Sequence, residues 1–350
     1  MLSDAGLRIA TYNIEWFDAL FDDAGHLHAD GERSGRHGVT RAEQTAAVAH
    51  VLTRLDADAI LVVEAPDISG RRDGAAALQR FAGQAGLRAN RALRGFSNDT
   101  QQELILLYDP TRITAHHDPK GAITGPEGRT DAPRFDGVYR IDLDIDATED
   151  HVVFSKPPLE LALETPLGPM RMIGCHVKSK APHGARNDAD AMRLSIANRR
   201  KQLAQCIWLR ERIEAHLDAG EALIVLGDLN DGPGLDEYEK LFGRSGVEIV
   251  MGSDAPPDRQ LYDPHARRAL QSRMSAKPAT ARFYLSAEEQ YLSALLDYIM
   301  VSPGLRPVAR SWRIWHPFDD PECWRDPDLR DALLAASDHF PVTLDMAPAA

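Results

Sequence analysis

The chain has 350 residues, of which 43% are hydrophobic and 27% are charged, a balance typical of a globular protein with a large apolar core. Its formal net charge of −13 repels polyanions, which excludes a protein that binds nucleic acid through its overall charge. No apolar stretch reaches the length of a transmembrane helix, and the N-terminus lacks the basic and apolar regions of a secretory signal. We therefore expect a cytoplasmic, soluble protein without a membrane span.

The first half of the chain alternates predicted strands and helices. Residues 8–14 predict a strand, and a capping box at Thr40 and Glu43 precedes apolar residues at helical spacing. Residues 59–63 predict a buried strand, and residues 73–85 predict a second helix that ends at a glycine.

The second half begins with predicted strands that we expect to form antiparallel hairpins. They cover residues 104–108, 138–145, 159–163 and 170–176. A long amphipathic helix is expected over residues 190–217, followed by apolar strands at residues 223–226 and 295–300.

Residues 251–290 lose periodicity and collect proline, arginine, serine and aspartate, so we expect a long loop excursion there. The polar motif residues fall at both extremes of the chain, near residues 13 and 339. Because both ends are expected to serve one site, a single domain is predicted over residues 1–350.

Three cysteines, Cys175, Cys206 and Cys323, lie far apart in the sequence and show no metal-binding spacing. The sequence therefore predicts neither a zinc site nor a disulfide framework. Buried thiols in a reducing compartment fit this pattern.

Polar residues stand where the predicted strands end. An unpaired buried carboxylate costs several kcal/mol of desolvation energy, so something must compensate such residues. The residues concerned are Asn13, Glu15, Glu64, His176, Asp228, Asn230, Asp297, Asp338 and His339.

The oxygen donors of this set suit magnesium, manganese or calcium far better than zinc, which prefers nitrogen and sulfur. They are Glu64, Asp338 and Asn13, with Glu15 or Asp228 as further candidates. A divalent cation would neutralise the acidic residues, polarise a phosphoryl oxygen and stabilise the charge on a leaving alkoxide. The expected cofactor is Mg²⁺, with Mn²⁺ as a substitute, and the expected chemistry is hydrolysis of phosphate esters.

Each fragment has a purely structural alternative when it is taken alone. Asn13 could hydrogen-bond its own backbone in a turn, and His176 could be a satisfied core histidine. Asp338-His339 could be a helix cap followed by a turn. Only the combination of fragments separates the functional interpretation from these alternatives.

A calcium loop is the rival interpretation of the segment after residue 226. Asp228, Asn230 and Glu239 would occupy its first, third and twelfth positions. However, its sixth position must be glycine and here is Pro233, and an apolar strand stands in place of the entering helix. These departures argue against an EF-hand.

Taken together and in order, the fragments resemble the endonuclease/exonuclease/phosphatase superfamily, which includes deoxyribonuclease I-like nucleases, abasic-site endonucleases, inositol-phosphate 5-phosphatases and neutral sphingomyelinases. The resemblance spans essentially the whole chain. The segments that carry it are Thr11-Tyr12-Asn13-Ile14-Glu15-Trp16, Val62-Val63-Glu64, Gly174-Cys175-His176-Val177-Lys178-Ser179, Gly227-Asp228-Leu229-Asn230, Leu296-Asp297-Tyr298-Ile299 and Ser337-Asp338-His339-Phe340-Pro341-Val342.

The resemblance implies an α/β fold, a four-layer α/β/β/α sandwich of two mostly antiparallel mixed sheets with the site at one edge. It implies that Glu64 is the principal metal carboxylate and that Asn13 and Asp338 complete or support the metal shell. Glu15 stands where relatives carry a second, sometimes shared, acidic ligand.

The resemblance also implies catalytic roles. Asp228 would orient or deprotonate the attacking water, while Asn230 and His176 would donate hydrogen bonds to phosphoryl oxygens. His339 would hydrogen-bond a phosphoryl oxygen or exchange a proton, held in its tautomer by Asp297.

Two departures from the relatives concern neighbours of these residues. Val63 precedes the metal glutamate where relatives often carry glutamine. The sequence leaves the hydrogen-bond partner of His176 open. Side chains alternate between the two faces of a strand, so in a strand that ends at Tyr108 it is Gln102, rather than Glu103, that shares the face of Tyr108. A neutral partner is therefore possible.

The stretch from His176 to Lys180 resembles a bacterial nuclease-like subgroup, and Lys178 is a predicted substrate contact. An arginine-rich helix follows, which could grip a nucleic-acid backbone or be a solvated face balanced by nearby acids. Lys156 occupies a strand position where relatives often carry arginine, so it is a second candidate phosphate contact. The aromatics that could stack on a base are equally well explained by core packing.

The preferred function is a divalent-metal-dependent nuclease whose partner is a phosphate-ester substrate, with nucleic acid favoured and no obligate protein partner evident. A small-molecule or lipid-headgroup phosphatase on the same scaffold is the alternative. A catalytically inactive binding module is disfavoured because all the proposed catalytic residues are retained.

Overall fold

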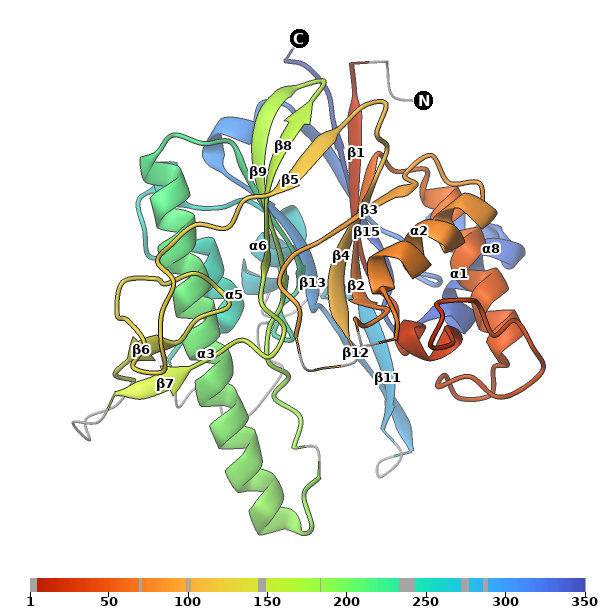
Figure 1. The fold of residues 1–350 in the computed structure, drawn as a ribbon, viewed down its shortest axis with the longest axis horizontal. Coiled ribbons are helices and arrows are strands. Elements are labelled where there is room, and N and C mark those ends of the chain that lie inside the picture. The colour runs from red at the N-terminus through yellow and green to blue at the C-terminus, as the bar shows by residue number, and fades with distance from the viewer. Residues whose placement is uncertain are drawn as a thin grey trace.

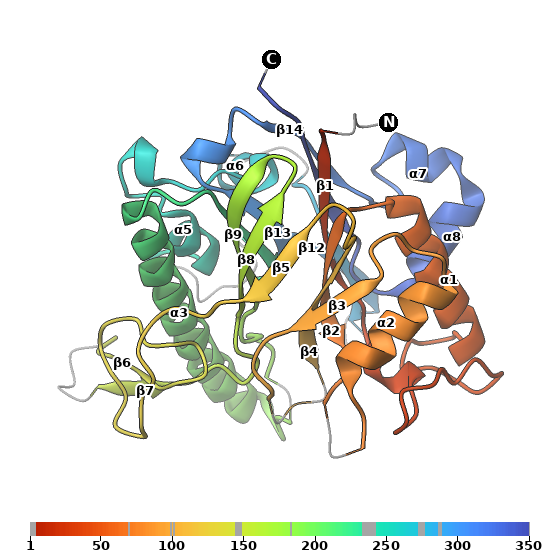
Figure 2. The ribbon, with the colours of Figure 1, turned by 45° about the horizontal axis from the view of Figure 1, so that its top comes forward.

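The computed structural model describes residues 5–68, 71–98, 100, 102–143, 149–182, 184–232, 243–271, 277–285 and 289–349. Two β-sheets pack face to face, and helices cover the outer face of each sheet (Figures 1 and 2). This four-layer α/β/β/α arrangement confirms the predicted fold class. The strand pairs β1–β2 and β9–β10 are parallel and the other pairs are antiparallel, so both sheets are mixed and mostly antiparallel.

The first sheet has six strands and carries both ends of the described chain. Their spatial order is β14 (Ala309–Ile314), β15 (Val342–Met346), β1 (Leu7–Asn13), β2 (Ala59–Ala65), β4 (Glu103–Tyr108) and β3 (Arg91–Arg94). Its outer face is covered by α1 (Arg41–Leu55), α2 (Gly74–Gln84), α7 (Pro321–Arg325) and α8 (Pro327–Ala336) (Figure 2).

The second sheet has five strands from the middle of the chain. Their order is β13 (Asp297–Val301), β10 (Leu223–Asp228), β9 (Gly168–His176), β8 (Leu159–Thr165) and β5 (Thr114–His117). Its outer face packs against α3 (Asp188–Asp218), α5 (Gly246–Met251) and α6 (Pro264–Gln271). Two separate hairpins complete the strands: β6 (Tyr139–Ile141) with β7 (Asp150–Val152), and β11 (Ala281–Leu285) with β12 (Gln290–Ala294).

The alternation of apolar side chains along the central strands produces the layers. In β2, Leu61 lies in the core between the sheets, whereas Val62 packs under the helices. In β10, Leu226 lies between the sheets and Val225 packs under α3 and α5. Because successive strand residues point to opposite faces, a strand that is apolar throughout serves two cores at once.

The predicted helices are confirmed with small shifts of their ends. Thr40 caps α1 through a complete capping box with Glu43, and the Asp73 side chain caps α2. Helix α3 spans Asp188–Asp218, two residues earlier and one residue later than the predicted 190–217.

Two predictions about the second half of the chain need correction. The expected loop at residues 251–290 contains the 3₁₀ turn Pro257–Arg259, helix α6 and strand β11. The buried side of α6 is formed by Ala266 and Ala269, which are too small to mark a helical stripe in the sequence. The strand predicted over residues 138–145 is limited to β6, and residues 144–148 lie outside the described part of the chain.

None of the helices among the described residues combines the length and apolar character needed to cross a lipid bilayer.

The contact between Leu61 of β2 and Gly174 of β9 tests the packing of the two sheets. A Cβ atom at Gly174 would lie 2.6 Å from the Leu61 Cδ1 atom. We expect Leu61→Ala to lower the free energy of unfolding by ~2–5 kcal/mol and Gly174→Ala to lower it by ~1–3 kcal/mol. The double variant should lose less than the sum, because the new methyl group enters the space left by Leu61. Urea denaturation of all four proteins measures this coupling, and strictly additive losses would contradict the contact.

Candidate active site

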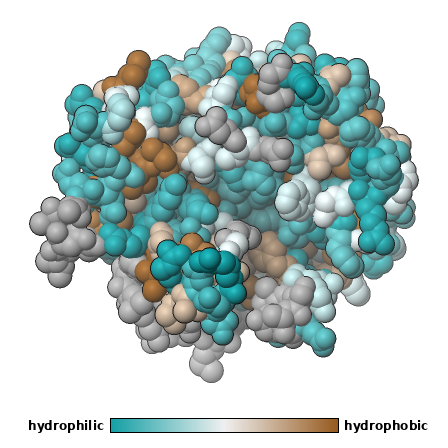
Figure 3. All heavy atoms as spheres, turned by 60° about the horizontal axis from the view of Figure 1, so that its bottom comes forward, coloured by the Kyte–Doolittle hydropathy of each residue, from teal (hydrophilic) through white to brown (hydrophobic). Residues whose placement is uncertain are grey.

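The predicted site residues meet at one edge of the two sheets. Strands β1, β2, β9 and β10 end at this edge, and β13 and β15 begin there because they run antiparallel to β10 and β1. A cavity of about 930 Å³ opens at this edge, and all predicted site residues line it except Asp297, which lies behind His339. Figure 3 shows this face of the molecule, which is hollowed near its centre and largely hydrophilic.

Glu64 is directed into the cavity by an irregularity in β2. The pairing of β2 with β4 shifts register between Val63 and Ala65, and Glu64 itself has a φ of 60°. A left-handed conformation is costly for a residue other than glycine, and β-bulges are frequent beside functional sites, where they re-aim a side chain. The strand thereby turns a carboxylate away from the apolar core and toward the cavity.

The oxygen donors that face Glu64 fit a hard divalent cation. Burial, reinforced by the charge of Asp338, raises the pKa of Glu64 above its usual range, although Lys156 and His339 oppose this. The Asn13 side chain is buried, and its Oδ1 atom has no hydrogen-bond partner among the described residues. Mg²⁺ and Mn²⁺ prefer oxygen ligands, and this site offers an amide oxygen without a hydrogen-bond partner among the described residues, next to several carboxylates.

Glu15 lines the same cavity, but its carboxylate is already held. Its Oε2 atom accepts a hydrogen bond of 2.6 Å from Arg36, and its Oε1 atom accepts one of 3.1 Å from the Trp16 indole. Burial and Asp338 raise the pKa of Glu15, and Arg36 counteracts this rise. Among the described residues, Glu15 is therefore the one predicted metal ligand whose carboxylate forms an ion pair with a cationic side chain.

Asp228 is fixed at the end of β10 by three N–H groups. The Asn13 side-chain amide donates at 3.0 Å, the Asn230 backbone donates at 2.7 Å, and the Asn230 side-chain amide donates at 3.2 Å. The preceding residue must be Gly227, because its φ is 126° and a Cβ atom there would lie 2.1 Å from the Cys175 carbonyl oxygen.

The Asn230 amide makes contacts that differ from its expected role. Its Nδ2 atom donates to Asp228 and, at 3.1 Å, to the Val177 carbonyl. Both amide hydrogens are thus directed at the protein rather than at a phosphoryl oxygen. In this structure Asn230 holds Asp228 in place.

The ends of β10 and β13 bring two carboxyl groups together with His339. Asp228 and Asp297 are direct partners in the strand register, and both lie within 4.8 Å of a His339 ring nitrogen. Burial, followed by the charge of Asp297, raises the pKa of Asp228 to about 7. His339 Nδ1 lies 2.8 Å from an Asp297 oxygen. Burial alone would lower the pKa of His339, but Asp297, Asp228 and Asp338 outweigh burial and raise it well above its usual range.

His176 has a different environment from His339. Its Nε2 atom lies 3.7 Å from Asp228, and its Nδ1 atom lies 3.2 Å from the Lys156 amine, which also donates to the side-chain oxygen Oε1 of Gln102. Burial and the neighbouring cation hold the pKa of His176 well below its usual value. Gln102, the neutral residue expected near His176, is therefore close to the ring but does not bind it directly. Lys156 lies between them and contacts both side chains.

The basic stretch after His176 is largely neutralised within the protein. Lys180 and Arg199 both bind Asp231, which is completely buried. Arg200 pairs with Asp150, and the exposed Arg186 and Arg193 both pair with Asp190. Lys178 and Lys180 both line the cavity, but Lys178 differs from these residues because it forms no ion pair within the described part of the chain.

Several supporting residues were not singled out from the sequence. Ser337 donates to the Asn13 carbonyl and accepts from the backbone N–H groups of Glu15 and His339, which joins the two ends of the chain. Thr280 accepts from the backbone N–H groups of Leu296 and Asp297. Ser337 stands inside a motif, whereas nothing in the sequence marks Thr280.

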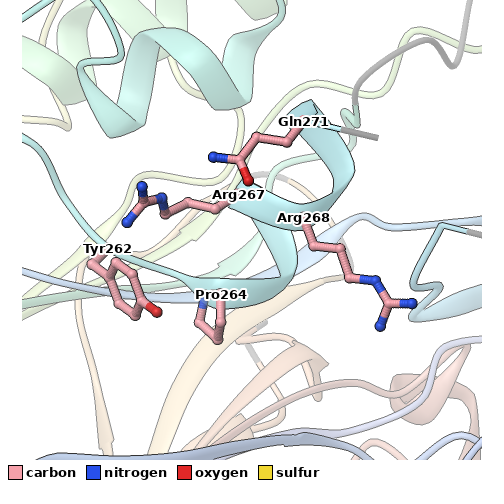
Figure 4. Close-up of a pocket in the computed structure, with 5 residues that line it drawn as sticks. All are labelled: Tyr262, Pro264, Arg267, Arg268 and Gln271. Atoms are coloured by element: carbon pink, nitrogen blue, oxygen red, sulfur yellow. The ribbon is translucent and has the colours of Figure 1, made fainter. Parts of the chain in front are cut away.

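A second hollow, of about 370 Å³, lies beside α6 and is lined by Tyr262, Pro264, Arg267, Arg268 and Gln271. The two arginines extend in different directions from the helix (Figure 4). None of these five residues is a carboxylate or a histidine, so this hollow offers no counterpart to the catalytic groups at the strand edge.

Comparison with known proteins agrees with this geometry. The sequence profile of the Endonuclease/Exonuclease/phosphatase family matches residues 10–339. The chain belongs to this family. It is accordingly a metal-dependent phosphoric ester hydrolase of the endonuclease/exonuclease/phosphatase type, and the predicted relationship is confirmed. The search of curated proteins found no significant match to the sequence.

Solved structures of family members share the fold at low sequence identity. TDP2 from D. rerio, crystallised with a single-strand DNA product, superposes with a TM-score of 0.51 at 12% identity over 99% of this chain and 100% of that chain. The 3′-5′ exonuclease NExo from Neisseria meningitidis gives 0.50 at 15% identity over 98% and 100%. Truncated TDP2 from Caenorhabditis elegans gives 0.50 at 14% identity over 99% and 100%.

The raised pKa of Asp228 predicts a pH-dependent effect of Asp228→Asn on stability. Without metal, the folded protein binds this proton more tightly than the unfolded chain, whose ordinary value is 3.8, so the carboxylate costs stability as the pH rises toward about 7. The variant loses hydrogen bonds at every pH but avoids this cost. The unfolding free energy of the variant minus that of the parent should therefore be larger at pH 8 than at pH 5, by on the order of 2 kcal/mol. Urea denaturation in the presence of chelator measures this, and an equal difference at both pH values would contradict the assignment.

Proposed function

We propose that this protein is a magnesium-dependent nuclease that hydrolyses phosphodiester bonds in nucleic acid. One observation carries the proposal: carboxylates, an amide oxygen and two histidines of opposite protonation preference surround one cavity in a member of this family. The DNA product bound to D. rerio TDP2 and the exonuclease activity in the name of NExo support nucleic acid as the substrate class.

Glu64, Asp338 and Asn13 are the residues that would hold the cation, with Glu15 beside them and bound to Arg36. When bound, a divalent cation polarises a phosphoryl oxygen and stabilises the negative charge that develops there or on the leaving oxygen. The crowded carboxylates also gain from it, because the charges that raise the pKa of Glu64 and Glu15 are then compensated.

Asp228 is the general base of the proposed mechanism. Its carboxylate is held by Asn13 and Asn230, so it needs no reorientation before it accepts a proton from the attacking water. A pKa of about 7 places it near the optimum for a base that works at neutral pH.

The two histidines divide the remaining work. His176 is neutral, so it can donate one N–H to a phosphoryl oxygen without adding a full charge. His339 is held through Nδ1 by Asp297, which leaves Nε2 to contact the phosphoryl group or to exchange a proton. Lys178 at the cavity wall provides a further contact for the negatively charged substrate.

Metal dependence is the first test of the proposed function. With Mg²⁺ the protein should hydrolyse bis-p-nitrophenyl phosphate, and Glu64→Gln should lower kcat/KM ~100-fold or more because the carboxylate that binds the cation is lost. Glu164→Gln, at the exposed far end of β8, is the matched control and should retain the parent activity. Initial rates with and without chelator measure the effect.

Equal turnover in excess chelator would refute the metal assignment. A separate assay of the same preparation, with Mg²⁺ present, compares single-stranded DNA, duplex DNA, RNA and phosphorylated inositols as substrates. Preferential cleavage of an oligonucleotide supports the nuclease, whereas turnover of inositol phosphates alone supports the phosphatase alternative.

The His339–Asp297 pair predicts a second kinetic result. His339→Ala should lower kcat ~100-fold or more, in line with the contribution of a positioned acid or base. Asp297→Asn should also lower kcat, because the imidazole loses the partner that fixes its Nδ1 atom. Single-turnover measurements isolate the chemical step. A His339→Ala enzyme with an unchanged single-turnover rate would remove this histidine from the mechanism.

A further inference from the structure

The contacts of Lys156 do not match those of a lysine kept free for a phosphate. Lys156 follows Phe154, which is buried against Trp208 and Phe135, and precedes Pro157 and Pro158. This anchored segment directs the amine inward, where it donates to the side-chain oxygen Oε1 of Gln102 and lies 3.2 Å from His176 Nδ1. Two of its donor directions are therefore used by side chains of the protein.

The contact with His176 is compatible with one tautomer only. A lysine ammonium has donors and no acceptor, so the ring nitrogen that faces it must be unprotonated. With a proton on Nδ1, two donors would oppose each other at 3.2 Å in a buried place. With Nδ1 as the acceptor, the neutral ring carries its proton on Nε2, the atom that faces Asp228 and the cavity.

We propose that Lys156 is a positioning residue that, braced by Gln102, fixes His176 as the Nε2-protonated neutral tautomer. His176 then presents a hydrogen-bond donor to the substrate at every turnover. This inference rests on the proposed function only for the role of that donor. It replaces the expectation that Lys156 itself contacts a phosphate.

The charge distribution around Lys156 agrees with a positioning role. Glu64 and Asp228 favour its protonated form, while burial opposes it and lowers its pKa. A cation beside Nδ1 also disfavours protonation of the ring, which is one reason that the pKa of His176 lies well below its usual value. Lys156 thus keeps His176 neutral and at the same time selects which nitrogen bears the hydrogen.

The tautomer can be measured without reference to activity. In protein labelled with ¹⁵N-histidine, long-range ¹H–¹⁵N correlation spectra distinguish the two ring nitrogens, and His176→Gln identifies the signals. The parent protein should show His176 protonated on Nε2. Lys156→Met should shift the signals toward a mixture or toward Nδ1 protonation. Lys178→Met, which removes a second lysine from the same cavity, should leave them unchanged.

Kinetics separate positioning from substrate contact. Lys156→Met should lower kcat on the order of 10- to 100-fold with little change in KM, the range typical of groups that orient a functional imidazole. Lys156→Arg keeps a donor and a positive charge and should recover part of that loss. Thermal unfolding and the spectra of the other histidines show whether each variant is folded.

Unchanged His176 signals in folded Lys156→Met would overturn the proposal, as would an equal change in Lys178→Met. A rise in KM at constant kcat would also overturn it, since this is the signature of a direct phosphate contact. If the parent protein showed no metal-dependent hydrolysis, the proposed function would fail, while the ¹⁵N spectra would still decide the role of Lys156.

Discussion

The structure is organised around the cost of placing several carboxyl groups at one buried edge. Asp228 and Asp297 are opposite each other across β10 and β13, and each is almost completely buried. Two such charges repel each other, and N–H donors on Asp228 and the imidazole of His339 beside Asp297 compensate them. His339 comes from the far end of the chain.

Strand direction is what makes this concentration of charge possible. Parallel pairing of β1 with β2, and of β9 with β10, brings four strand ends to one edge, while antiparallel β13 and β15 begin there. Ser337, in the segment that carries His339, donates a hydrogen bond to the Asn13 carbonyl. This bond joins residues that are 324 positions apart in the sequence. The first and last segments that line the cavity therefore adjoin β1 and β15, which are adjacent strands of one sheet.

Much of this arrangement could be predicted because its signals are local. Apolar strands that end in a polar residue mark their own position, and the order of six such segments identifies the family and hence the fold. Contacts between distant segments carry no such signal: Arg36 with Glu15, and Lys156 with His176, join residues that no periodicity relates. The hairpin β11–β12 was missed for another reason, since residues 290–293 in β12 are exposed and show no buried alternation.

Asp231 explains why basic residues accumulate beside the site of so acidic a protein. It immediately follows Asn230, and it accepts hydrogen bonds from Lys180, Arg199 and the backbone N–H of Gly246. These contacts tie the loop after β10 to the loop after β9, to the interior of α3 and to the start of α5. Lys180 and Arg199 are thus used to hold the loops beside the cavity, and in the proposed mechanism substrate attraction is left to the cation and to Lys178. The proposed nuclease would therefore rely on its cation for electrostatic attraction as well as for chemistry, because the net charge of −13 opposes the approach of a polyanion.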